Sequence, residues 1–88
     1  MKRERITAWI TKYALTNGIT VETGEVCHDI SSKMFFYDYN NVHGNDWHRT
    51  PEDALDRAEE MRTAKIANLK NQIAKLERMT FTAPTKPD

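Results

Sequence analysis

The sequence predicts an α+β domain, in which a short antiparallel three-stranded sheet is followed by one long amphipathic C-terminal helix (βββα). Three observations predict this class. Polar and apolar residues alternate over residues 6–15, aromatic residues crowd residues 33–39, and a helix-start pattern at Thr50-Pro51 precedes apolar residues spaced by three and four. We expect a single domain over residues 1–81. Residues 82–88 contain two prolines and no periodicity, so we expect them to form a disordered tail.

The composition limits the classes of function that are open to this chain. A domain of 88 residues has a thin core, which disfavours a deep substrate cavity. Thirteen basic and thirteen acidic residues give a net charge of +0, so the chain lacks the strong basic field of a nonspecific nucleic-acid binder. A single cysteine excludes an internal disulfide and favours a reducing compartment such as the cytoplasm. The apolar runs are too short to span a bilayer, so we expect no membrane partner.

The first two predicted strands surround a turn signal. Residues 6–15 place Ile6, Ala8, Ile10 and Ala14 on one parity, and Asn17-Gly18 then offers the positive φ angles of a tight hairpin. The second strand covers residues 19–27, where Gly24 marks a bulge or a turn. Residues 28–32 connect it to a third strand over residues 33–39, and residues 40–46 are rich in turn formers.

The helix start is the clearest local pattern. Thr50 is placed as N-cap, Pro51 as the first helical residue, and Asp53 at the third helical position. The helix should run from Pro51 to about Arg78. Its apolar residues fall on one stripe: Ala54, Leu55, Ala58, Met61, Ile66, Leu69, Ile73 and Leu76. Twenty-eight residues reach about 42 Å, against about 23 Å for a seven-residue strand, so the helix should overhang the sheet.

The overhanging half of this helix carries an a/d heptad pattern, with Arg62 interrupting it upstream. Its four apolar positions are Ile66, Leu69, Ile73 and Leu76. These residues need a cover, which is either a second copy of the chain in a homodimer or another partner. Charge is also sorted, with acidic residues toward the start and basic residues toward the end. That order suits the helix dipole as well as a binding role.

The aromatic residues allow three interpretations. If the helix covers the Ile6, Ala8 and Ile10 side of the sheet, Trp9 and Tyr13 face outward as part of a protein interface. They could instead close the core, because a one-residue change of register exchanges the two faces. Base stacking on the sheet is the third interpretation. The candidate partner-binding residues are Trp9, Tyr13, Phe35, Tyr37, Tyr39, Trp47, Arg62, Lys65 and Lys70.

Catalytic and metal chemistry are poorly supported. Potential ligands occur at Cys27-His28-Asp29, Asp46 and His43-x4-His48, but no C-x2-C pair accompanies them. Cys27 and His28 are neighbours along a strand, so their side chains point to opposite faces and do not form a nucleophile-base pair. The three glycines are too far apart for a phosphate-binding loop. We therefore expect no enzyme activity, no cofactor and no metal.

Three segments carry a resemblance to known proteins: residues 6–19 (ITAWITKYALTNGI), residues 46–50 (DWHRT) and residues 65–70 (KIANLK). Across most of residues 6–81 the chain resembles a group of small phage and prophage accessory proteins. The resemblance implies a protein that acts in the host cytoplasm. It also implies, by analogy of setting, inhibition of host machinery such as a CRISPR defence complex.

Two hypotheses follow. The leading one is a small phage-derived, non-enzymatic protein that binds and inhibits or modulates a host protein complex, through the aromatic sheet face or the distal helix. The alternative is a small nucleic-acid-binding regulator. It would use the basic residues of the distal helix against phosphates: Arg62, Lys65, Lys70, Lys75 and Arg78.

Overall fold

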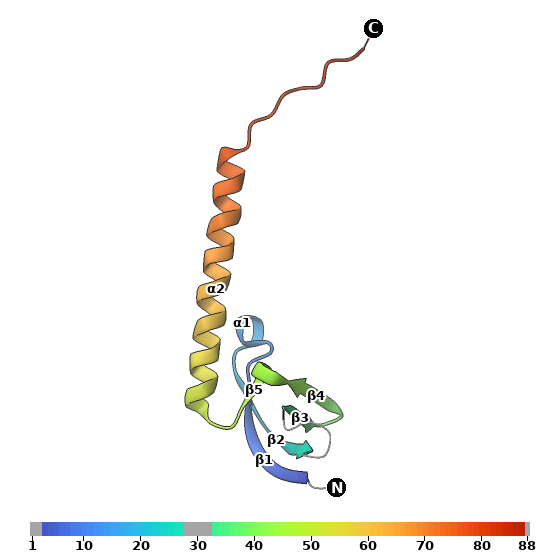
Figure 1. Cartoon of the computed structure of the whole chain (residues 1–88), viewed down its shortest axis with the longest axis vertical. Helices are drawn as coiled ribbons and strands as arrows, with labels where there is room; N and C mark the ends of the chain where they lie inside the picture. The colour runs from blue at the N-terminus through green and yellow to red at the C-terminus, as the bar shows by residue number, and fades with distance from the viewer. Residues whose placement is uncertain (1–2, 28–32, 88) are drawn as a thin grey trace.

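The computed structural model describes residues 3–27 and 33–87 and confirms the α+β class, but the sheet has five strands instead of three (Figure 1). The strands are β1 (Arg3–Ile10), β2 (Thr20–Cys27), β3 (Met34–Tyr37), β4 (Asn40–His43) and β5 (Trp47–His48). The helices are α1 (Ala14–Asn17) and α2 (Pro51–Arg78), with a 3-10 turn, η1 (Gly44–Asp46), before β5. The connector predicted at 28–32 lies outside the described residues. No helix within the described ranges is long and apolar enough to cross a membrane.

The strand order forces the sheet to curl. All pairings are antiparallel in the order β4-β3-β2-β1-β5, so β4 and β5 follow one another in the chain but lie at opposite edges. Four strand spacings in a flat sheet would separate these edges by about 19 Å. Four Cα steps from His43 to Trp47 reach at most about 14 Å. The two edges must therefore approach each other, and the sheet takes the shape of a small, incompletely closed barrel.

The hydrophobic core lies inside this curl. It consists of six buried residues: Ala8, Ile10, Val26, Phe35, Val42 and Trp47. Phe35 pairs with Val26 on one side and Val42 on the other, and its ring centroid lies 5.5 Å from that of Trp47. The predicted inward parity is correct for Ile6, Ala8 and Ile10, but Ala14 lies in α1, beyond the end of β1. The interpretation in which this face packs against the long helix is wrong. The sheet covers its own inner face because it curls.

The first strand is shorter at its C-terminal end than predicted. β1 ends at Ile10, and the chain then makes one turn of helix, α1, in place of a strand to residue 15. Gly18, at φ 81°, ends that turn, and its amide donates to the carbonyl of Ala14. The Asn17-Gly18 signal thus terminates a helical turn instead of forming a two-residue hairpin. Thr11 is buried between these elements, where its hydroxyl donates to the Asn45 carbonyl at 3.1 Å.

The two-residue hairpin occurs further along the chain. Tyr37 pairs with Asn40, and the residues between them, Asp38 and Tyr39, have φ angles of 41° and 65°. Both values are positive, as in the type I′ turns that match the twist of paired strands. The predicted third strand therefore ends two residues early. The segment predicted as turn formers supplies β4, because Asn40–His43 pairs with β3 despite the weak strand preference of asparagine.

Gly24 permits a close approach between β2 and β3. The ladder between β1 and β2 continues through Gly24, which pairs with Ile6, so this glycine marks neither a turn nor a gap in that ladder. A Cβ atom at this position would lie 2.0 Å from the Phe36 carbonyl oxygen and 2.9 Å from Cζ of Phe35. β3 therefore approaches β2 at a distance that only glycine permits.

The long helix has the predicted bounds and cap. Thr50 is the N-cap, its hydroxyl accepts from the Asp53 amide at 3.2 Å, and Pro51 is the first helical residue. Within α2 the buried residue is Ala54. The helix contacts α1, β5 and β1 near its start and then extends past the sheet, which confirms the predicted overhang (Figure 1). The radius of gyration is 20.8 Å, against about 12 Å for a compact domain of this length.

Candidate partner-binding surfaces

A row of exposed apolar side chains lies on the far half of α2. We call it the distal seam and define it as Ile66, Leu69, Ile73 and Leu76. At 100° per residue these four side chains fall within an arc of about 80°. Their exposed fractions are 38, 43, 53 and 67%, increasing toward the end of the helix. Met79 and Phe81, just beyond the helix, are 50 and 86% exposed. This is a continuous apolar stripe without cover in the monomer.

The distal seam does not face the body of the protein. The side chains of α2 that are buried or half-buried at its start are Ala54, Arg57, Ala58 and Met61. A shallow groove of about 350 Å³ separates this side of α2 from Leu15 of α1. By helical geometry the mean direction of the seam is turned about 90° from the side that meets the body. A second helix could therefore lie along the seam without meeting the sheet.

Charge changes sign along α2. Residues 51–61 carry five acidic residues and one basic residue, a net charge of −4, whereas residues 62–78 carry five basic and one acidic, a net charge of +4. The predicted binding residues Lys65 and Lys70 lie in the basic half, and both are exposed. They occupy the g and e positions that border the seam on its two sides.

An ion pair marks the upstream end of the seam. Glu59 and Arg62 occupy the a and d positions one heptad before Ile66 and Leu69, and the Arg62 guanidinium hydrogen-bonds to the Glu59 carboxylate. This hydrogen bond and the attraction between the two charges lower the pKa of Glu59 and raise that of Arg62. The predicted binding residue Arg62 is thus engaged within its own helix, and the apolar seam begins only at Ile66.

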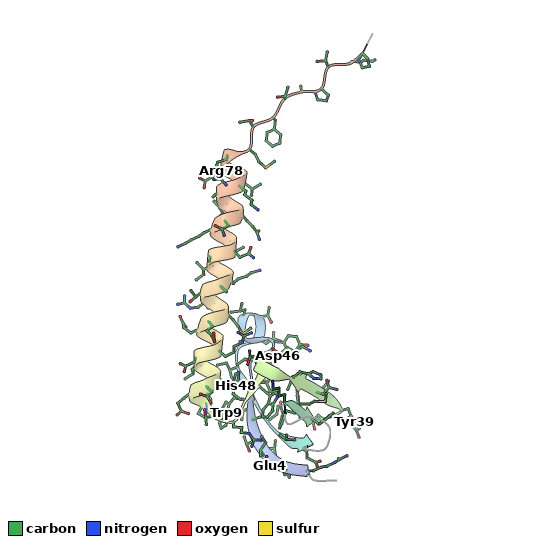
Figure 2. The ribbon with its side chains drawn as sticks, in the orientation of Figure 1. Glu4, Trp9, Tyr39, Asp46, His48 and Arg78 are labelled. Carbon is green, nitrogen blue, oxygen red and sulfur yellow. The ribbon has the colours of Figure 1, made fainter. Side chains whose placement is uncertain are left out.

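The second candidate surface lies at the tip of the β3–β4 hairpin. Tyr39 is fully exposed there, and Figure 2 shows it at the edge of the sheet distant from α2. A bulky side chain at φ 65° is unfavourable, since this turn position prefers glycine. Beside the tip, an open hollow of about 640 Å³ is lined in part by Arg3, Arg5, Phe36 and Asn41. Arg3 and Arg5 both lie close to Glu25, at 3.1 and 3.9 Å.

Three other aromatic residues predicted to bind a partner range from half-buried to exposed. Trp9 is half-buried opposite His48 on the outer face, near the start of α2 (Figure 2). Tyr13 is 53% exposed, with the Lys12 ammonium 5.5 Å from its ring centroid. Tyr37 is half-buried and its ring stacks on Phe35 at 5.8 Å.

Phe35 and Trp47 require a correction, because both were predicted on a binding surface. Phe35 is 0% and Trp47 7% exposed, and the Trp47 indole N–H donates to the Lys33 carbonyl at 2.8 Å. They are core residues, because the curl of the sheet turns their faces inward. The predicted single aromatic binding face therefore does not form. The hollow beside Phe36 was missed, and the available signal was the alternation that places Phe36 opposite Phe35.

The potential metal ligands do not converge. His43 lies 3.2 Å from the Asn41 amide oxygen and His48 lies 3.1 Å from the Thr11 hydroxyl, on opposite edges of the sheet. Within the described ranges, no three histidine, cysteine or acidic side chains form a group that could hold a metal ion. His28 and Asp29 lie outside these ranges.

Comparison with known proteins places no further limit on the function, since no family model, curated protein or solved structure matches this chain.

Proposed function

We propose that this chain is a small, phage-derived, non-enzymatic binding protein that docks on a host protein complex and inhibits or modulates it. The observation that supports this function best is the distal seam, four apolar side chains exposed on a helix that extends past the rest of the molecule. Exposed apolar stripes of this kind are typical of helices that lie in the groove of a partner. The phage origin and the host complex, for which a CRISPR defence complex is one candidate, follow from the sequence resemblance alone.

In this proposal the two parts of the fold have separate roles. The curled sheet forms the stable core around Phe35 and Trp47. The capped start of α2, where Ala54 is buried, contacts β5 and β1, and the far half of α2 presents the seam. The core of this small sheet is filled by packed side chains, so it leaves little room for an enclosed active site.

The test is capture of host proteins by immobilised wild-type chain, compared with two variants of equal charge. Ile73→Asp places a carboxylate in the seam, and Asn71→Asp places one about 160° around the helix. We expect Ile73→Asp to lose the captured complex and Asn71→Asp to retain it, with both variants equally helical by circular dichroism. Capture that is unchanged by Ile73→Asp would exclude docking through the seam.

The activity of the captured complex provides a second readout. In bacteria with an active CRISPR system, expression of the wild-type chain should restore the plating of a targeted phage. Expression of Ile73→Asp should not. Restoration by both proteins would place the inhibitory surface elsewhere.

A regulator that binds nucleic acid is the second candidate, and the net charge of +4 on residues 62–78 favours it. Phosphate contacts release counterions, so affinity would fall steeply as salt increases. An electrophoretic shift measured between low and high salt tests this candidate. A shift that requires Lys65, Lys70 and Lys75 but is indifferent to Ile73→Asp would favour nucleic acid over a protein partner.

A further inference from the structure

We infer that the partner of the distal seam is an amphipathic helix whose apolar stripe is bordered by acidic residues. This inference rests on the proposed function and deepens it, because it names the chemistry of the partner. The possible occupants of the seam differ in the charges that they would place beside Lys65 and Lys70.

A second copy in parallel register is unfavourable at this seam. Pairing Ile66, Leu69, Ile73 and Leu76 with themselves places Lys65 at a g position opposite Lys70 at the e′ position of the other copy. In the symmetric dimer each Lys65 would face the Lys70 of the other copy, so both of these pairs would be repulsive. The two basic halves, each with a net charge of +4, would also lie side by side.

A second copy in antiparallel register meets two further obstacles. If Ile66 packs against Leu76 of the other copy, the symmetry brings the two Lys70 side chains together. If the basic half instead lies on the acidic half of the other copy, Glu59 and Arg62 occupy the facing a and d positions. Their ion pair would be buried against Leu69 and Ile66 of the partner copy, at a high desolvation cost.

A separate helix with acidic flanks satisfies both features of the surface. Leucine or isoleucine at its a and d positions would cover the seam. Glutamates at its e and g positions would face Lys65 and Lys70, which are exposed on both borders. Beyond these two lysines, Lys75 and Arg78 keep the surrounding potential positive, which favours an acidic partner during association.

The experiment uses two synthetic three-heptad peptides with isoleucine at a and leucine at d. One has glutamate at every e and g position and the other has lysine there. Like charges keep each peptide from pairing with itself. Binding to the full chain is measured by fluorescence anisotropy at low and high salt. We expect the glutamate peptide to bind at least about tenfold more tightly than the lysine peptide, with the difference shrinking as salt increases.

Charge reversal supplies the decisive comparison. The double variant Lys65→Glu with Lys70→Glu should reverse the preference toward the lysine peptide. Asn71→Asp should leave the wild-type preference in place and Ile73→Asp should abolish binding of both peptides. Equal binding of the two peptides by the wild-type chain, or a preference for the lysine peptide, would overturn the inference. So would a stable dimer at micromolar concentration in sedimentation equilibrium that Ile73→Asp dissociates.

These outcomes separate the inference from the proposed function. If host capture depends on Ile73 but the glutamate peptide does not bind, docking through the seam stands and the acidic partner helix falls. If the peptide preference reverses as expected but no host complex is captured, the chemistry of the seam stands and the proposed function falls.

Discussion

The indole N–H of Trp47 donates a 2.8 Å hydrogen bond to the main-chain carbonyl of Lys33, which joins β5 to the residue that precedes β3. The same carbonyl accepts from the Gly44 amide, also at 2.8 Å. The bond from Trp47 connects the opposite edges of the curled sheet, because β3 and β4 lie toward one edge and β5 forms the other. The bond from Gly44 extends the pairing of β3 with β4 by one residue. The Trp47 ring also stacks near Phe35, so one side chain closes the curl and fills it.

Trp47→Phe should therefore destabilise the fold by about 1–2 kcal/mol, since it removes the indole donor and part of the ring volume. Lys33 keeps its bond from Gly44, which limits the loss. Urea unfolding followed by circular dichroism measures the change. Trp9→Phe, at a half-buried position on the outer face, serves as the control. It should lower the free energy of unfolding by less than about 1 kcal/mol. Equal losses for the two variants would contradict a closing role for Trp47.

Gly24→Ala should be more damaging than its size suggests. The added Cβ would lie 2.0 Å from the main-chain oxygen of Phe36, so β3 must move away from β2. We expect a loss of about 2 kcal/mol or more in the free energy of unfolding. Gly44→Asn is the matched control, because its Cβ meets open space and asparagine tolerates a φ of 55°. A Gly24→Ala protein as stable as Gly44→Asn would show that the close approach of the strands is not required.

Tyr39→Gly should stabilise the domain by about 1 kcal/mol. The Tyr39 side chain is fully exposed and makes little contact that folding needs. Its φ of 65° is unfavourable for residues with a Cβ, with asparagine and aspartate as the main exceptions. Tyr39→Ala removes the ring but keeps the unfavourable φ, so it should give no gain. The thermal unfolding midpoints of the two variants, compared with that of the wild type, measure both effects. A similar gain in both variants would assign the effect to the ring instead of the backbone.

The carboxyl group of Glu59 should titrate below the usual range of glutamate. Its pKa is lowered by the hydrogen bond from Arg62 and by the positive charge of that side chain. A depressed pKa in the folded state means that the pair favours the folded form above the unfolded-state pKa. This contribution is lost as the pH falls through the folded-state pKa. The pair is solvent-exposed, so its effect on stability should be small.

Carbon-detected NMR titration of the side chain measures this pKa directly. In the Arg62→Gln variant the pKa of Glu59 should rise toward its ordinary value. An unchanged titration of Glu59 in that variant would show that the ion pair is not formed in solution.

Local sequence determined the long helix and its apolar stripe. Thr50 and Pro51 define the start of α2 through an N-cap hydroxyl and a residue that needs no amide partner, so the helix begins as predicted. The 3- and 4-residue spacing from Ile66 to Leu76 places those residues on one side of any α-helix, whatever surrounds it. The same spacing puts Lys65 and Lys70 on the two borders of that stripe. These features depend on residues within one or two turns of each other.

The tertiary structure alone decided the number of strands and which aromatic residues are available. β4 is rich in asparagine and β5 has only two residues, so each is a strand only because another strand pairs with it. β4 pairs with the neighbouring β3, and β5 pairs with β1 near the start of the chain. Phe35 and Trp47 are internal because the short η1 connection draws the sheet edges together, and no periodicity within a strand reports that curvature. The pairing of β5 with β1 and the curvature of the sheet arise from contacts between residues far apart in the chain, whereas helical spacing is fixed by neighbours.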